Sequence, residues 1–255
     1  KTLIVHSGSE AKGLGRLDLE IKDNKVTNYK YEYIPIDGEP RKDLAKKELE
    51  DPRFKKLLKQ YMAKLNPYLD KKIGSSKSFL SRNKSREQEI PLGDLLAESI
   101  LETGKCDVSI IPAGNLRGEL PEGVLRVRDA YKVYPATKSI VVSLVKPEEL
   151  IEILKQGYFN QIRKDKPRFV QIAGMKIKIK DKKIYIKEIQ GKEPDPDKKY
   201  SLCTDDLVAS GGNGMTFMEQ VSDKTETDSN VRDAFVDKIK REKVLDYKTD
   251  GRIEL

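Results

Sequence analysis

Residues 107–118 read DVSIIPAGNLRG, and this stretch decides the fold class. Residues 107–111 are a short apolar run of the kind that is buried in a sheet, and a glycine-containing loop over 112–118 follows it directly. In open α/β sheets, ligands bind in the loops at the carboxyl ends of strands. Asn115 and Arg117 are therefore candidate binding residues, although a plain strand-to-turn connection would have the same pattern.

The sequence around this stretch predicts an α/β (α+β) protein with layered mixed sheets flanked by helices. Apolar residues recur with helical spacing in the segments expected as helices, which are 91–103, 147–156 and 230–240. Apolar or alternating runs predict strands at 140–145, 169–172, 175–179, 183–189 and 200–204, with a short strand and a helical turn inside 124–134.

The N-terminal part of the chain is organised differently. An apolar run at 2–5 and alternating segments within 16–35 predict β structure with a hairpin. A hairpin is not stable alone, so its sheet lies either later in this chain or outside it. Helical spacing then predicts a short helix at 41–49 and a longer one at 52–65 that Pro67 ends. We expect these helices to connect two units.

Composition excludes several classes of protein. The 255 residues hold 50 Lys and Arg against 42 Asp and Glu, a net charge of +8, but the two signs are interleaved. Such mixing favours a solvated surface over a nucleic-acid interface. Charged residues reach 36%, above the roughly 25% of soluble domains, and the surplus of Lys and Glu is thermophile-like. No window approaches the roughly 18 apolar residues of a membrane span, and the first residues lack the apolar core of a signal peptide.

Metal and nucleophile chemistry find little support in the residue types. The sequence has a single histidine, His6, so histidine-based metal motifs are excluded and we expect this residue to be structural. No GxSxG elbow marks a catalytic serine. Cys106 and Cys203 either pair or stay free, and we expect buried free thiols.

Two further segments carry groups suited to anions. Arg82 and Arg86 precede a helix that begins near Pro91. One guanidinium group can bind two phosphate oxygens at once, and a helix N-terminus favours a negative charge nearby. Residues 210–217 hold three glycines within four positions, which indicates unusual dihedrals or close backbone approach. An ordinary basic loop and a tight turn are the alternatives for these segments.

Taken in order, several segments resemble the C-terminal domain of the 5′-nucleotidase family, which includes bacterial UDP-sugar hydrolases. EIPLGDLLA at 89–97 resembles the family's E-x-x-LGN-LxxDA helix, and IIPAGNLRGEL at 110–120 resembles its NAGGIR segment. The other similar segments are 131–144 (LPFGN strand), 200–217 (GGDGY segment), 251–253 (closing GRI), 3–22 (end of the N-terminal metallophosphatase domain) and 41–72 (interdomain helix).

The resemblance implies a domain layout and a division of labour. Residues 1–38 would be a remnant of the N-terminal domain, 39–72 the linker helices and 73–255 the substrate-binding domain. Two divalent metal ions on the N-terminal domain would hydrolyse the phosphoester. This chain would then hold no catalytic residue, metal ligand or cofactor, and would be inactive alone. Its partners would be a nucleotide or related small phosphorylated substrate and that N-terminal domain, in the periplasm or outside the cell.

The resemblance also implies binding residues, with departures from the family pattern. Arg82, Arg86 and Arg117 match phosphate-contacting arginines. The substrate-binding positions that we expect on this basis are Arg82, Arg86, Asn115, Arg117, Lys138, Gly211, Gly212, Asn213 and Met215. The departures are Pro112 for an Asn, Ala136 for the stacking Phe, Lys138 for an Asn, Asn213 for an Asp and Met215 for an aromatic residue.

Both base-stacking rings are thus replaced, and ring stacking contributes about 1–3 kcal/mol per base. Tyr134, Tyr158, Phe159 and Phe217 are the rings that would have to compensate. Two alternatives therefore stay open beside a nucleotide site. The domain is a non-catalytic binding or scaffold module with a degenerate pocket, or it belongs to a divergent branch that acts on another anion, as the sulfur-oxidation hydrolases do.

Overall fold

The computed structural model describes residues 2–8, 13–35, 51–159 and 169–255. The chain divides into two compact units, Lys1–Lys64 and Leu65–Leu255, and each is described by itself. Among the described residues, no helix is both long enough and apolar enough to cross a membrane.

The N-terminal unit contains the expected β-hairpin. Strands β1 (Gly13–Lys22) and β2 (Lys25–Pro35) pair antiparallel, with Leu19 opposite Tyr29. The turn between them is Asp23-Asn24, two residue types that tolerate the positive φ found at both positions. Within the described residues the hairpin pairs with no further strand. The expected β structure at 2–5 is wrong: this run has no regular structure, because nothing described in the chain pairs with it.

Helix α1 (Pro52–Leu69) begins where the sequence predicts and ends later. The Asp51 carboxylate accepts a hydrogen bond from the Arg53 backbone nitrogen at 2.8 Å, and a proline fits the first helical position. The prediction that Pro67 ends the helix is wrong, since α1 continues to Leu69 with that proline in its last turn. The short helix expected at 41–49 lies outside the described residues.

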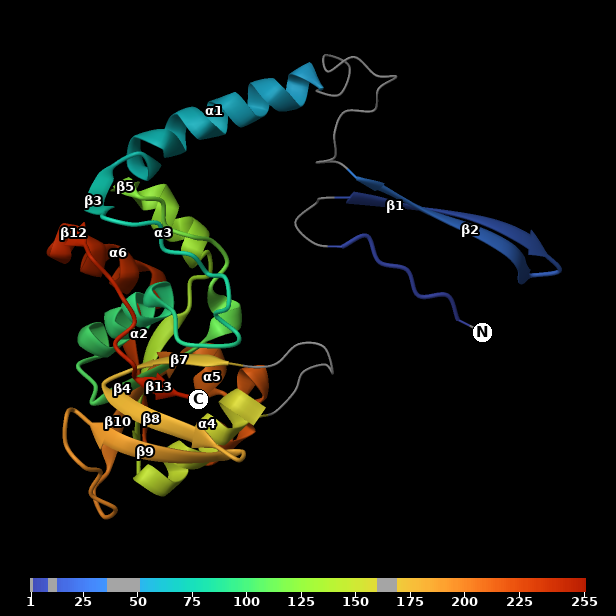
Figure 1. Ribbon diagram of the computed structural model, residues 1–255. Helices are drawn as coiled ribbons and strands as arrows, with labels where there is room; N and C mark the ends of the chain where they lie inside the picture. The colour runs from blue at the N-terminus through green and yellow to red at the C-terminus, as the bar shows by residue number, and fades with distance from the viewer. Residues whose placement is uncertain (1, 9–12, 36–50, 160–168) are drawn as a thin grey trace. The chain divides into compact units, whose positions relative to one another are not determined.

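A mixed sheet forms the centre of the Leu65–Leu255 unit (Figure 1). The described residues place its strands in the order β11-β6-β10-β4-β7, with β10 and β4 parallel and the other neighbours antiparallel. The strands are β4 (Val108–Pro112), β6 (Ser139–Val145), β7 (Val170–Ala173), β10 (Tyr200–Asp205) and β11 (Lys224–Asn230). Four of these strands agree with the sequence-based segments; the polar strand β11 was not predicted, because KTETDSN lacks an apolar pattern.

The sheet separates two apolar cores. In β4, Val108 and Ile110 face one core while Ile111 faces the other, as the period of two requires. One core lies under α2 (Pro91–Gly104), α3 (Val127–Val133) and α6 (Val231–Glu242). The other lies under α4 (Pro147–Phe159) and the hairpin of β8 (Met175–Lys180) and β9 (Lys183–Ile189). This arrangement confirms the predicted fold class of mixed sheets flanked by helices.

Short elements complete the unit. The sheet β12-β3-β5 joins β3 (Lys72–Ser76), β5 (Gly123–Arg126) and β12 (Val244–Leu245), and β13 (Ile253–Glu254) pairs with β8. The remaining turns of helix are α5 (Asp206–Ala209) and the 3₁₀ segments Ala113–Asn115, Gly212–Gly214 and Thr216–Gln220. Strands of two residues such as β12 and β13 are too short to show an alternating pattern, and they form where the C-terminal segment pairs with β3 and β8.

The expectation of free thiols is wrong, because Cys106 and Cys203 form a disulfide. The parallel pairing of β4 with β10 sets Cys203 beside Ser109 and so brings Cys106, two residues before β4, within reach, with the Cα atoms of the two cysteines 5.8 Å apart. A Cβ atom at Gly104 would lie 2.1 Å from the Cys203 sulfur, so the end of α2 closes over the bridge. The disulfide therefore ties α2, β4 and β10 together.

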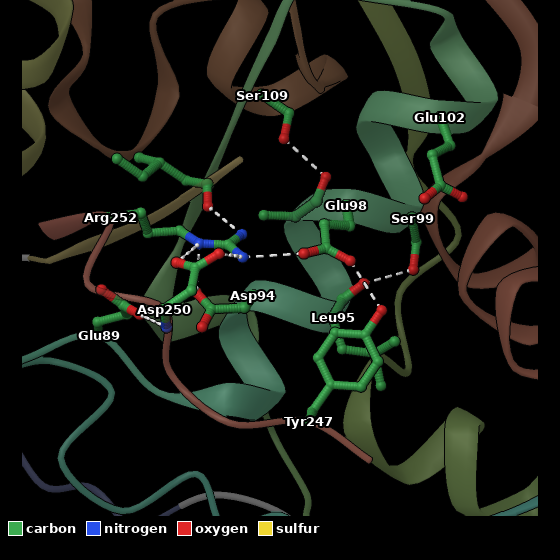
Figure 2. A network of polar contacts seen from close by, with 12 residues as sticks. Glu89, Asp94, Leu95, Glu98, Ser99, Glu102, Ser109, Tyr247, Asp250 and Arg252 are labelled. Carbon is green, nitrogen blue, oxygen red and sulfur yellow. Dashed lines mark hydrogen bonds and ion pairs between the residues drawn. The ribbon is translucent and has the colours of Figure 1, made fainter. Parts of the chain in front are cut away.

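A polar cluster fastens the C-terminal segment to α2 (Figure 2). The buried guanidinium of Arg252 donates hydrogen bonds to Glu98 at 2.9 Å, to Asp250 at 2.7 Å and to the Ile172 backbone oxygen at 3.1 Å. Glu98 also accepts a hydrogen bond from the Tyr247 hydroxyl at 2.7 Å. A buried charge is costly unless it is paired, so these contacts fix the C-terminal segment with Tyr247 and Arg252 against α2.

Candidate anion-binding site

A pocket of about 190 Å³ opens where β4 runs into the loop that follows it. Its described lining residues are Arg86, Pro112, Gly114, Asn115, Arg117, Gly157, Phe169, Val170, Asn213 and Met215. The pocket thus joins three of the segments that the sequence singled out. They are the arginine loop before α2 (81–89), the loop after β4 (112–118) and the glycine loop that follows β10 and α5 (210–217). It lies at the carboxyl end of β4, the position where α/β sheets bind ligands.

Arg86 and Arg117 supply positive charge to this pocket. The guanidinium of Arg86 lies over Gly114, where a Cβ atom would be 2.7 Å from its Nη2. Arg117 is exposed, and its backbone nitrogen donates to the Val133 oxygen at 2.8 Å, which fixes the chain beneath the side chain. No carboxylate is among the described lining residues. Two guanidinium groups without a competing acid make a site for an anion.

Arg82 does not join the other arginines among the described lining residues. Its Nη1 donates to the Leu116 backbone oxygen at 3.4 Å, and its backbone nitrogen donates to the Glu119 carboxylate at 3.3 Å. The side chain therefore bridges the arginine loop and the loop after β4.

Asn115 and Lys138 both form hydrogen bonds to a buried carboxylate, that of Asp205 at the end of β10. The Asn115 Nδ2 donates to Asp205 Oδ2 at 2.6 Å, and Lys138 Nζ lies 3.4 Å from both carboxylate oxygens. Asp205 also caps α5 by accepting from the Val208 nitrogen at 2.9 Å. It is fully buried, so these partners offset the loss of its hydration. Asn115 also lines the pocket directly, whereas Lys138 is not among the described lining residues.

Tyr134 belongs to the same group of contacts. Its hydroxyl donates to Asp205 Oδ2 at 3.4 Å. Burial, with the neighbouring Asp205 carboxylate, raises the pKa of Tyr134 far above its usual value, so the hydroxyl keeps its proton and acts as a donor. Asp205 was missed as a site residue by sequence reasoning, although an acidic pair at the end of a predicted strand was visible as Asp205-Asp206.

The glycine loop forms another wall. Gly211 and Asn213 both have positive φ, and a Cβ atom at Gly212 would lie 2.4 Å from the Leu207 backbone oxygen. Gly211 and Gly212 therefore shape the loop without lining the pocket within the described residues, whereas Asn213 lines it. The Asn213 Nδ2 atom is buried and finds no hydrogen-bond partner among the described residues. An acceptor atom on a ligand would satisfy it.

The apolar floor contains a ring that sequence reasoning missed. Phe169 lines the pocket and packs edge-on against Tyr158, with ring centroids 4.9 Å apart. Only 6% of Phe169 is exposed, so the ring presents little of its face to a ligand for stacking. Met215 beside it is almost fully buried. The rings proposed to compensate, at Tyr134, Tyr158, Phe159 and Phe217, are not among the described lining residues.

Comparison with known proteins finds one matching family model and several relatives. The family model described as "5'-nucleotidase, C-terminal domain" matches residues 72–220. Protein UshA of Yersinia enterocolitica is 26% identical, over 99% of this chain and 48% of its own length. The chain spans about half the length of the curated relatives it matches.

Solved structures share the fold. A 5′-nucleotidase precursor from Thermus thermophilus superposes with a TM-score of 0.69 at 21% identity, over 95% of this chain and 50% of that one. The sulfate thiohydrolase SoxB from the same species superposes with a TM-score of 0.62 at 14% identity, over 95% of this chain and 44% of that one. At these identities the likeness is one of fold.

Proposed function

The chain belongs to the 5′-nucleotidase C-terminal domain family, and from that membership we propose that residues 73–255 form the substrate-binding domain of a larger phosphohydrolase. In this proposal Arg86 and Arg117 hold the phosphate of a nucleotide or related substrate, while a catalytic domain outside this chain breaks the phosphoester. The observation that carries the proposal is the placement of both arginines in the pocket beside Gly114, without a carboxylate among its described lining residues.

The catalytic half would be the N-terminal metallophosphatase domain of such a hydrolase. Metal ions bound there supply an activated water and neutralise developing charge. No cluster of three His, Cys, Asp or Glu side chains suited to a metal occurs among the described residues of this chain. What this chain contributes is anion binding and orientation, and we expect it to hydrolyse nothing alone.

Residues 1–38 fit the end of that catalytic domain. Leu19, Tyr29 and Tyr33 of the β1–β2 hairpin are all more than two-fifths exposed. A two-stranded hairpin with such side chains in water is marginal by itself. We therefore assign it to a sheet of the N-terminal domain, with residues 39–72 as the linker. The disulfide between Cys106 and Cys203 supports an oxidising compartment, the periplasm or the cell exterior.

A second candidate is a site for an anion that is not a nucleotide. The positions of the base-stacking rings hold Ala136 and Met215, and the described lining offers Phe169 with little exposed face. The arginines are kept while the base clamp is not, which favours recognition of the charged group over the base. The shared fold with a sulfate thiohydrolase is in keeping with this candidate.

A binding panel separates these candidates. We would measure calorimetric binding of inorganic phosphate, sulfate, AMP, UMP, UDP-glucose and adenosine, each with and without Mn²⁺, together with thermal unfolding. A ligand that binds only the folded chain raises the unfolding midpoint by mass action. Tighter binding of a nucleotide than of phosphate or adenosine supports the nucleotide site. Equal responses to AMP and bare phosphate would favour the second candidate, a site for an anion that is not a nucleotide.

Arginine variants test the site itself. Arg86→Ala should weaken binding of every anionic ligand by about tenfold or more, since a charge-assisted hydrogen bond contributes about 1.5–3 kcal/mol. Arg241→Ala, on an exposed arginine of α6, is the matched control and should leave binding unchanged. If Arg86→Ala and Arg117→Ala both leave all responses as they were, the domain is a scaffold with a degenerate pocket and the proposal is wrong.

A further inference from the structure

The arginine loop that carries Arg86 has weak local structure of its own. Between Ser81 and Glu89 its backbone bonds are short-range turns, such as Ser85 N to the Arg82 oxygen at 3.1 Å. Its start is held where Leu80 bridges to Leu120. Something beyond these ends must fix the middle of the loop, where Arg86 stands.

Gln171 holds that middle segment from the neighbouring strand β7. Its Nε2 donates to the backbone oxygens of Ser85 and Gln88, each at 2.9 Å, and its Oε1 accepts from the Ile90 nitrogen at 3.2 Å. Arg86 lies between two residues that Gln171 binds. The amide is fully buried, and its bonds to Ser85 and Ile90, which are buried too, form without competition from water.

Gly93 shows how closely the amide is enclosed. A Cβ atom at this position of α2 would lie 2.4 Å from Gln171 Oε1, so the first turn of the helix can pass over the amide only because residue 93 is a glycine. The glutamine is thereby clamped in one rotamer. Its hydrogen bonds reach the arginine loop from a fixed point.

Strands β7 and β4, which pair with each other, also build part of the pocket wall. In β7, Val170 pairs with Pro112 and Gln171 pairs with Ile111, and the loop with Gly114 and Arg117 follows directly. Val170 faces the pocket, while Gln171 faces α2 and the arginine loop. Consecutive residues of one strand therefore set both sides of the site.

We propose that Gln171 is the positioning residue of the anion site: it holds the 85–90 segment so that the Arg86 guanidinium lies over Gly114, in the pocket that Arg117 also lines. Gln171 touches no ligand in this role and acts through Arg86. The inference rests on the proposed function, since it presumes that Arg86 binds an anion.

The test is a double-mutant cycle on the full 255-residue chain, with inorganic phosphate and AMP as the probes. Gln171→Met keeps the length of the side chain and removes its hydrogen bonds. We expect it to weaken binding of both probes by about tenfold, a loss typical of coupled neighbours. In the Arg86→Ala background, the same change should have no further effect. A merely structural role would lower affinity by the same factor in both backgrounds.

Two more variants keep the test decisive. Gln171→Leu also removes the hydrogen bonds and adds no charge, so it serves if the methionine variant does not fold; it too should weaken binding in the wild-type background alone. Gln190→Leu is the matched control, because this glutamine also donates to a backbone oxygen, that of Asp107, away from the anion site. It should bind both probes as the wild type does.

The outcomes separate the two ideas. If the wild type binds neither probe, or Arg86→Ala binds as well as the wild type, the proposed function fails and this inference with it. If Arg86→Ala weakens binding while the Gln171 variants bind normally or lose affinity equally in both backgrounds, the proposed function stands and the positioning role is refuted.

Discussion

Replacing Asp94 with asparagine should stabilise the protein near neutral pH and flatten its pH dependence. Asp94 is fully buried on α2, its carboxylate has no hydrogen-bond partner among the described residues, and the nearest cation is Arg252, with Nε 3.5 Å away. Burial is the main cause that raises the pKa of Asp94 to about 8 from 3.8. Arg252 opposes this rise, while Glu89, Asp250 and Glu98 add to it.

The sign follows from proton binding. Between pH 4 and pH 8 the folded state holds a proton on Asp94 that the unfolded chain has released, so the free energy of unfolding falls as the pH rises through this window. An asparagine side chain at this position would be neutral in both states. A full shift of this size corresponds to roughly 4 kcal/mol at pH 7. Because neighbouring groups relax around a buried charge, we expect Asp94→Asn to gain roughly 2–4 kcal/mol there.

Urea unfolding from pH 4 to pH 9 measures this effect. The stability advantage of Asp94→Asn should be near zero at pH 4 and should grow steadily until about pH 8. Asp250→Asn is the control with the opposite sign, because the hydrogen bond from Arg252 lowers the pKa of Asp250. Losing that group costs stability above pH 4, by less than about 1 kcal/mol since Asp250 is largely exposed. The reasoning is refuted if Asp94→Asn is no more stable than the wild type at pH 8.

Other changes probe the site and the bridge. Reducing the disulfide between Cys106 and Cys203, which are 97 residues apart, should lower the free energy of unfolding by roughly 2–4 kcal/mol; equal melting midpoints with and without reductant would contradict this. Asp205→Ala leaves the Lys138 ammonium and the Asn115 amide without their partner. We therefore expect the free energy of unfolding in urea to fall by roughly 2–4 kcal/mol and phosphate binding to weaken. Unchanged values in both assays would show that Asp205 does not organise the pocket wall. Asn213→Asp puts a carboxylate in the pocket that Arg86 lines, and calorimetry should find weaker phosphate binding; equal or tighter binding would place the anion elsewhere.

The sequence alone determined the elements with strong local patterns. The apolar run before Pro112, the amphipathic pattern of α2 and the alternation in β8 and β9 each depend on neighbours in the chain, and they predicted the fold class correctly. The order of short segments in 89–120 and 200–217 carried the family resemblance for the same reason. Turn residues such as Asp23-Asn24 placed the hairpin through their tolerance of positive φ.

Tertiary structure decided which of these residues meet. Nothing local distinguishes Arg82, which turns to the Leu116 oxygen, from Arg86, which lies over Gly114; the difference comes from Gln171, more than eighty residues away in the chain. The pairing of Cys106 with Cys203 likewise needed the parallel contact of β4 with β10. Contacts between distant residues leave no period in a single sequence, so they become visible once the strands are laid side by side.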